Sequence, residues 1–325
     1  MIPQSPADVV EQSYRERLKS LEPILLFSCT PDGEFNACVR TKGSGKTKWF
    51  IEFDAGLIHS SHLICMAALA SPNILRSVGD PDAETGWFKQ LSKPLPWLDA
   101  LSAYIQIKDE LGSIRIRPSC PVRADFSDRL LTNMLDFVLY HELGHIAHRH
   151  LGPQQSLFER YTSKPSSDSQ RIAQHVKEMQ ADAAGTIVSA LRCMNADQYD
   201  NRLRGWGLGA CLLTYLLGFS GEMDTLTESS HPHPSVRLIH VGSVVTSCPD
   251  LDVGEADWRG FIADMVDIVT ELNIYSSAVK FLTTRKDEAH AEYLRMQAHF
   301  EDASKPGLDP PRELQDMMSG TNKSN

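Results

Sequence analysis

The feature that most constrains the fold is a pair of histidines four positions apart inside an apolar stretch. Residues 141–145 read His-Glu-Leu-Gly-His and match the pattern H-E-x-x-H. They lie within residues 130–146, which are too apolar for a surface helix, so the motif is expected on a buried helix. Positions four apart return to nearly the same helix face, so both imidazoles could bind one metal ion. Buried histidines need polar partners, and a metal ion would supply them.

Glu142 is the candidate general base, because it follows the first histidine of the pair directly. A zinc ion lowers the pKa of a bound water to about 7, and a neighbouring carboxylate could take the proton. The same residues at this spacing also occur on solvated helices that bind nothing. The apolar neighbourhood favours the metal site, with Zn²⁺ as the cofactor.

Glu178, 33 positions after His145, is the candidate third ligand. Asp182 follows it by one helical turn on the same face, where it could accept a hydrogen bond from the remote nitrogen of a ligating histidine. The alternative is an ordinary exposed acidic pair. Against this alternative, the small residues within 181–185 would let the helix approach another helix closely.

The next histidines do not fit the metzincin pattern. That pattern needs Gly at position 148 and His at position 151, where this chain has His148 and Leu151. His148 and the nearby His150 are therefore expected to be polar groups or partners of the ligands and not ligands themselves.

A third block, residues 230–238, reads Ser-His-Pro-His-Pro-Ser-Val-Arg-Leu. A proline-rich turn before a helix is common, so the block carries weight only through its order after the first two. It offers two histidines, His231 and His233, for one position. Counting six positions back from Arg237 favours His231.

With H-E-x-x-H, then E-x-x-A-D, then H-P-x-x-x-x-R, the chain resembles the gluzincin group, which includes integral-membrane prenyl-protein proteases. Within this group it looks most like the Lit-type phage-exclusion peptidases. The likeness extends upstream to residues 34–40, Glu-Phe-Asn-Ala-Cys-Val-Arg, and covers roughly residues 30 to 240. The last 85 residues resemble nothing recognised.

The resemblance implies a zincin-like fold with three zinc ligands, a general base and two residues that approach from a later loop. These are His141, His145 and Glu178 for the metal, Glu142 for the base, and His231 and Arg237 for the loop. His231 or Arg237 would stabilise the oxyanion. In a competing interpretation, Arg237 pairs with Asp182 and only holds the second metal helix in place.

The resemblance also implies a biological role. Lit-type peptidases are dormant bacterial proteases that are triggered during phage infection and cut a host protein, such as a translation elongation factor. The implied partners are that protein substrate and an activating phage peptide or protein. Two rival functions remain: a regulatory peptidase that cleaves a repressor or antitoxin, and a zinc-stabilised interaction protein without turnover. Glu142 argues against the second, since a structural zinc site has four closed ligands and needs no base.

Composition indicates a soluble cytoplasmic protein. The chain has 325 residues, 42% of them apolar, enough for a large core. Its seven cysteines are odd in number and form no C-x-x-C pair, which is typical of reduced thiols. No export signal is visible at the N-terminus. A net charge of −10 argues against nucleic acid as a partner.

One uncharged stretch, residues 205–221, approaches the length of a membrane helix. It contains five glycines and is flanked by Arg204 and Glu222. We therefore expect a buried helix packed on the metal helices, with no membrane partner.

The expected fold class is α+β. Two alternating segments, residues 35–40 and 47–53, predict a β-hairpin, and residues 104–107 and 114–117 predict a second one. The segment 114–117 could also be an edge strand that aligns an extended substrate. Residues 43–47 read Gly-Ser-Gly-Lys-Thr but lack the first glycine and the following helix of a P-loop.

After about residue 126 the pattern becomes helical. The expected helices lie near 126–150, 170–194, 205–219, 234–246, 256–272 and 276–301. The expected organisation is an N-terminal part, 1–125, packed closely on a helical part, 126–302, with a disordered tail at 303–325.

Overall fold

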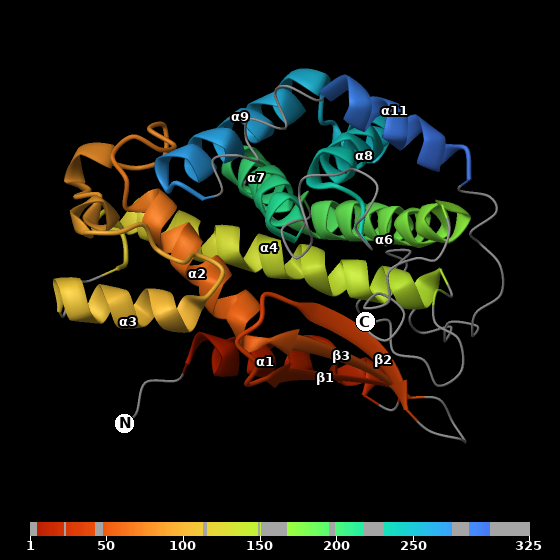
Figure 1. The fold of residues 1–325 in the computed structure, drawn as a ribbon, viewed down its shortest axis with the longest axis horizontal. Helices are drawn as coiled ribbons and strands as arrows, with labels where there is room; N and C mark the ends of the chain where they lie inside the picture. The colour runs from red at the N-terminus through yellow and green to blue at the C-terminus, as the bar shows by residue number, and fades with distance from the viewer. Residues whose placement is uncertain are drawn as a thin grey trace.

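A computed structural model shows a small sheet near the N-terminus and helices over most of the remaining chain (Figure 1). It describes residues 5–22, 24–42, 48–112, 116–148, 150, 168–194, 199–217, 231–274 and 286–299. The α+β prediction is confirmed, because in the described segments the strands all lie before residue 55 and the helices that carry the motifs follow later.

The sheet has three strands, β1 (Leu25–Thr30), β2 (Ala37–Lys42) and β3 (Lys48–Asp54), in the order β1-β3-β2. β2 and β3 pair antiparallel, which confirms the first predicted hairpin. β1 was not expected, and it runs parallel to β3. β2 therefore lies at one edge of the sheet. The turn at 43–47 lies outside the described residues.

The predicted second hairpin is wrong, because residues 104–107 belong to helix α3 (Ala100–Leu111). The Asp99 carboxylate caps this helix by accepting the backbone N–H of Ser102 at 3.1 Å. Gly112 ends it at a φ of 66°, which favours glycine. These cap residues outweigh the short alternating pattern between them.

The predicted edge strand at 114–117 is also wrong for the residues that the structure describes there. Ile116 and Arg117 are not in a strand, while 113–115 fall outside the described residues. The Ile116 carbonyl accepts the indole N–H of Trp87 at 3.2 Å, and Arg117 pairs with Asp128 at 2.6 Å. Both residues are thus attached to helical segments and not to the sheet.

Helix α4 (Pro121–Ala147) is the central element and carries the H-E-x-x-H motif. It lies between the sheet on one side and the later helices on the other (Figure 1). Its contacts include β2, α2 (Ala55–Leu69), α6 and α7. Asp136 on α4 accepts hydrogen bonds from two residues of α1 (Pro6–Arg17). The expected boundary at 125/126 falls inside α4.

Four of the remaining helices lie close to their predicted positions: α6 (Asp168–Met194), α7 (Tyr199–Leu217), α8 (Pro234–Ser247) and α9 (Glu255–Glu271). α11 (Lys286–Gln297) covers the later part of the helix predicted at 276–301, whose first ten residues lie outside the described ones. Within the described segments, short 3₁₀ helices occur at η1 (Lys19–Leu21), η2 (Pro81–Ala83), η3 (Trp87–Gln90) and η5 (Pro249–Leu251). The predicted tail at 303–325 lies outside the described residues.

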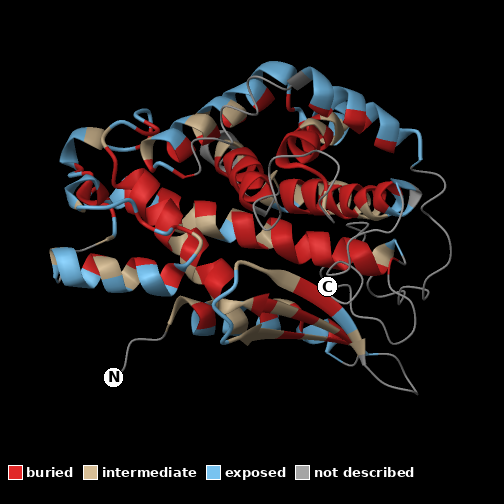
Figure 2. Ribbon diagram, viewed as in Figure 1, coloured by how far each residue is buried: buried red, intermediate tan, exposed pale blue. Residues whose placement is uncertain are grey.

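One large hydrophobic cluster unites residues of the N-terminal part and of the helical part. Figure 2 shows α4, α6 and α7 mostly buried, while α3, α9 and α11 each expose one face. The uncharged segment of α7 lies in this core, with Trp206 and Leu212 fully buried. Among the described residues, no helix combines the length and apolarity that crossing a bilayer requires.

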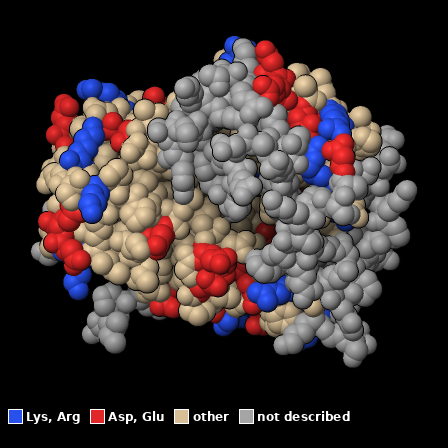
Figure 3. All heavy atoms as spheres, in the orientation of Figure 1, with Lys and Arg blue, Asp and Glu red and all other residues tan. Residues whose placement is uncertain are grey.

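The described surface carries both signs of charge, and Figure 3 shows acidic and basic side chains interspersed around one face. Some form exposed ion pairs within a helix, such as Arg259 with Glu255 and Arg129 with Asp125. Exposed pairs contribute little to stability, so the fold depends mainly on its core.

Candidate metal centre

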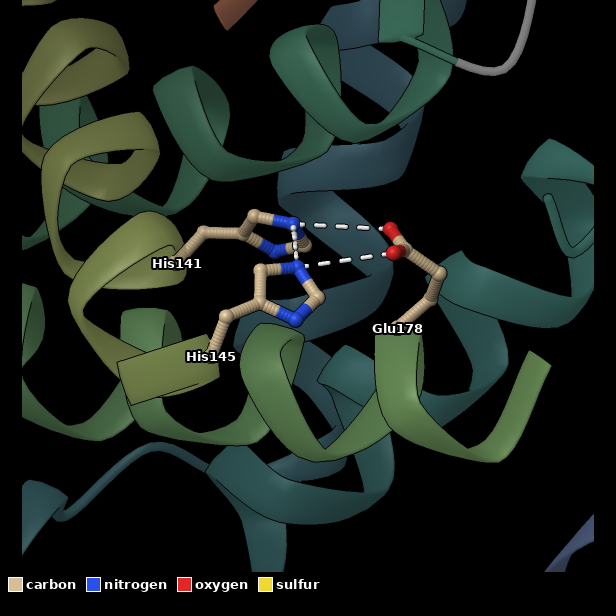
Figure 4. A group of neighbouring side chains, drawn as sticks. All are labelled: His141, His145 and Glu178. Atoms are coloured by element: carbon tan, nitrogen blue, oxygen red, sulfur yellow. Dashed lines mark hydrogen bonds and ion pairs between the residues drawn. The ribbon is translucent and has the colours of Figure 1, made fainter. Parts of the chain in front are cut away.

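Three side chains converge where the C-terminal end of α4 meets the middle of α6. The Nε2 atoms of His141 and His145 lie 3.1 Å apart. The two carboxylate oxygens of Glu178 lie 3.5 Å and 3.4 Å from these nitrogens, respectively (Figure 4). Tetrahedral zinc with bonds near 2.0–2.1 Å holds its ligand atoms about 3.3 Å apart. The spacing of this buried group therefore fits a metal ion.

The pKa values of the two histidines also suit the binding of a metal ion. Burial would lower the pKa of His141, but hydrogen bonds to Asp182 and Glu178 raise it to about 10. Burial lowers the pKa of His145 well below its usual value, so this ring is neutral. A metal ion bound there would take the place of the proton that the raised pKa of His141 favours, as metal binding to protonated ligands does.

Small residues allow α4 and α6 to approach closely at the centre. A Cβ atom added at Gly144 would lie 2.9 Å from the Cβ of Ala184 and 3.0 Å from the Cα of Ala181. A Cβ atom at Gly185 would lie 3.1 Å from the backbone nitrogen of His141. The expected close approach is therefore present, and it brings the Glu178 side chain to both histidines.

Two buried charged residues, Asp182 and Arg237, hold the ring of His141 through its Nδ1 atom. Asp182 Oδ1 lies 2.9 Å from His141 Nδ1. Arg237 donates to both carboxylate oxygens of Asp182, from Nε at 2.8 Å and from Nη2 at 2.5 Å. Burial would raise the pKa of Asp182, but Arg237 and His141 lower it to about 2. The carboxylate is therefore ionised and holds the His141 ring with Nε2 toward Glu178. This contact is the competing arrangement that the sequence left open for Arg237.

Glu142 belongs to α4, and its side chain lies against the edge strand β2. Burial raises its pKa to about 7 and the charge of Glu178 adds to this, while His141, Arg237 and a hydrogen bond with the Val39 backbone oppose the rise. Its Oε2 atom is buried and has no hydrogen-bond partner among the described residues. A carboxyl group with this pKa can accept and release a proton near neutral pH.

The two histidines of the third block have different surroundings. His233 caps α8, because its Nδ1 accepts the backbone N–H of Ser235 at 3.2 Å. His231 lies within electrostatic reach of Glu178: burial would raise the pKa of Glu178, but His145, His231 and His141 lower it, while burial lowers the pKa of His231 itself. The structure thus brings His231 near the metal ligands and uses a ring nitrogen of His233 for a helix cap.

The Nδ1 atom of His145 has a partner of its own, which no pattern in the sequence predicts. His150 Nδ1 lies 2.8 Å from His145 Nδ1, and His150 Nε2 lies 2.8 Å from Gln180 Oε1. The sequence predicts His150 only as a polar group or a partner of the ligands, and it does not single out Gln180. His148 is exposed and stacks on His150 with ring centroids 5.6 Å apart.

Comparison with known proteins agrees with a peptidase. A family model described as Peptidase U49 matches residues 102–252, just under half of the chain. No curated protein and no solved structure matches the chain. The matched span contains the H-E-x-x-H helix, Glu178 and the block with His231 and Arg237. The chain is therefore similar to a peptidase family over the part that forms the candidate metal centre.

Proposed function

We propose that this protein is a zinc-dependent endopeptidase. The observation that carries the proposal is a buried Glu142 oxygen, without a hydrogen-bond partner in the part of the chain that the structure describes, beside three side chains spaced for a metal ion. The ligand set of two histidines and one glutamate leaves a position open, as in catalytic zinc sites. The Peptidase U49 match supports the same activity.

The chain's own residues would divide the work as follows. Bound zinc supplies Lewis acidity, which polarises a carbonyl and makes water easy to deprotonate near neutral pH. Glu142 takes the proton and delivers it to the leaving nitrogen. His231, partly exposed beside Glu178, stabilises the developing oxyanion. Arg237 positions His141 through Asp182.

Strand β2 is the proposed site for aligning an extended substrate. It is the edge strand next to α4, and Val39 of β2 forms a backbone hydrogen bond with Glu142. A peptide paired with this edge would run past the metal centre. The segment that aligns the substrate would then be β2, residues 37–42, and not residues 114–117 as the sequence suggests.

The biological role is proposed by resemblance. The Lit-type pattern suggests a cytoplasmic protease in phage defence, activated by a phage peptide or protein and directed at one host protein, such as a translation factor. None of the seven cysteines, all of which lie in described segments, forms a disulfide, which suits a reducing compartment. A peptidase that cleaves a repressor or antitoxin would use the same site, and a non-catalytic zinc protein would not need Glu142.

The decisive experiment compares wild-type protein with Glu142→Gln. The variant should retain about one zinc per chain and lose on the order of 10²- to 10⁴-fold in rate, because Glu142 is proposed as a base and not a ligand. Mass spectrometry of cellular proteins exposed to each form would identify the cut substrate. Asp125→Asn, an exposed carboxylate on the same helix, is the matched control and should keep full activity.

Glu178→Ala completes the test, because it should lose zinc and activity together. A zinc-free Glu142→Gln protein would make Glu142 a ligand. Cleavage at the wild-type rate by Glu142→Gln would remove the proposed base. If the cellular proteins show no cleavage products with either wild-type protein or Glu142→Gln, the result would favour the non-catalytic zinc protein.

A further inference from the structure

The chain returns to the second metal histidine after α4 has ended. The backbone N–H of His150 donates to the carbonyl of His145 at 2.9 Å, a six-to-one contact of the type that closes helix C-termini. The ring of His150 then lies against the same residue, with the two Nδ1 atoms 2.8 Å apart. Both rings are about 2% exposed, so water does not compete for these atoms.

The same ring also contacts α6. Nε2 of His150 lies 2.8 Å from Oε1 of Gln180, which stands between Glu178 and Asp182 in the sequence of α6. The contact forms a chain of hydrogen bonds from the partly buried Gln180 on α6 through the buried His150 to His145. The chain ends on the nitrogen of His145 that faces away from Glu178.

The direction of these hydrogen bonds determines where the protons lie. Because the Gln180 oxygen accepts, His150 must carry its proton on Nε2, and its Nδ1 is then an acceptor. His145 must therefore donate from Nδ1, which leaves its Nε2 with a free lone pair. A His150 that donated from Nδ1 would place the His145 proton on Nε2, where it would block a metal ion.

We propose that His150 and Gln180 are positioning residues that hold the proton of His145 on Nδ1 and keep Nε2 free to bind a metal ion. The inference rests on the proposed metal centre. It assigns the two ligating histidines different supports. His141 is held by the charged pair of Asp182 and Arg237, and His145 is held by two uncharged groups. The second support thus fixes a ring without adding charge to the centre.

The first test is the position of the proton in metal-free protein. With ¹⁵N-labelled histidine, long-range ¹⁵N–¹H spectra distinguish a ring protonated on Nδ1 from one protonated on Nε2. Wild-type His145 should be protonated on Nδ1. Gln180→Leu should give a mixture of the two tautomers, and Gln180→Glu, which keeps an acceptor oxygen, should restore the wild-type form.

The second test is zinc affinity, measured by competition with a chelator and zinc alone. Gln180→Leu and His150→Phe should bind zinc about 10- to 100-fold more weakly, the usual cost of removing a partner of a ligand. Gln180→Glu should bind within about threefold of wild type. His290→Phe, at an exposed histidine on α11, is the matched control and should leave the affinity unchanged.

The outcomes separate this inference from the proposed function. A wild-type His145 protonated on Nε2 would overturn the inference even if zinc binds. Tight wild-type binding with an equal affinity in Gln180→Leu would do the same. If wild-type protein binds no zinc but its tautomer depends on Gln180 as described, the metal centre fails and the positioning pair stands. The Gln180 variants decide the matter if His150→Phe does not fold.

Discussion

Two fully buried arginines, Arg123 and Arg237, show how differently the two ends of α4 are built. Arg123 lies in the first turn of α4 and is 0% exposed. Arg237 lies on α8 beside the metal centre and is 1% exposed. A buried guanidinium needs hydrogen-bond acceptors in both places. The acceptors are backbone carbonyls in the first case and a carboxylate in the second.

Arg123 organises the chain that leads out of α2. Its guanidinium donates to the carbonyl oxygens of Leu69, Ser71, Ile74, Leu75 and Val78. Glu84 lies 3.9 Å away and accepts the backbone N–H of Cys120 at 2.8 Å. Burial lowers the pKa of Arg123, although Glu84 opposes the shift. This end of α4 holds a loop in one conformation and makes no contact with the metal ligands in the described structure.

Arg237 has a different chemical consequence. Burial would lower its pKa, but Asp182 outweighs burial and raises it. The same Asp182 holds His141, so a change at Arg237 reaches a ligand atom through one residue. The comparison teaches that equal burial of one residue type does not mean an equal role. The two arginines differ because the acceptor of Arg237, Asp182, also contacts a metal ligand, whereas the carbonyls that accept from Arg123 do not.

The largest expected effect is on folding, from Arg123→Met. Five carbonyls lose their donor and Glu84 loses its ion-pair partner, which should lower the free energy of unfolding by about 3–5 kcal/mol. The loss should be the same with and without zinc, because the residue is remote from the ligands. Denaturant unfolding in both conditions measures it. A loss that zinc reverses would show that this end of α4 is coupled to the metal.

Arg237→Met should cost a similar amount in metal-free protein, about 3–5 kcal/mol, because the Asp182 carboxylate stays buried without its partner. Saturating zinc should recover part of this loss, since a cation near His141 replaces some of the missing positive charge. The same unfolding measurements test it. An equal loss in both conditions would make Arg237 purely structural, like Arg123.

Gly144→Ala should weaken the contact between the metal helices. The added methyl group meets Ala184 at 2.9 Å, and overpacking of this kind costs about 1–3 kcal/mol. Zinc content should fall with it. Gly260→Ala is the matched control, because a Cβ there meets nothing within 4 Å on α9 and should stabilise the protein by about 0.5–1 kcal/mol. Normal zinc binding by Gly144→Ala would mean that the helices can separate without harm.

The smallest expected effect on zinc binding comes from Asp182→Asn, which keeps an acceptor for His141 but removes the charge; because it also leaves the buried Arg237 without its ionic partner, it should lower the stability of the fold as Arg237→Met does. Zinc affinity should fall about 10- to 100-fold. Chelator competition measures it, and Asp136→Asn is the control. Asp136 is a carboxylate bound by Arg17 and Tyr14 on another face of α4, so its variant should keep wild-type affinity. Equal affinity in both variants would remove the charge on Asp182 from the account of the metal centre.

The sequence was most informative where one helical period carries the signal. The pair His141 and His145, and the pair Glu178 and Asp182, each lie four positions apart, so one helix face fixes their relation. The helices from α4 onward were predicted near their observed positions for the same reason. α2 was missed, because it is buried nearly all round and follows β3 without an intervening turn.

The rest depends on contacts that no local pattern encodes. His150 reaches His145 through a chain reversal and not through helical periodicity. Arg237 and Asp182, which pair with each other, lie 55 positions apart in the sequence. Residues 104–107 alternate like a strand, but the caps at Asp99 and Gly112 make them helical. Cap residues would have been the better signal there.

The edge position of β2 also has a consequence for self-association. An open strand edge can pair with any extended chain, including another copy of the same protein, and such pairing leads to aggregation. β2 carries Arg40, whose side chain is 50% exposed and pairs with Glu52 of the neighbouring strand β3 at 2.5 Å. Charged side chains on an edge strand oppose its pairing with a second identical strand. The strand can therefore stay open beside the metal centre while two copies of the protein remain apart in a crowded cell.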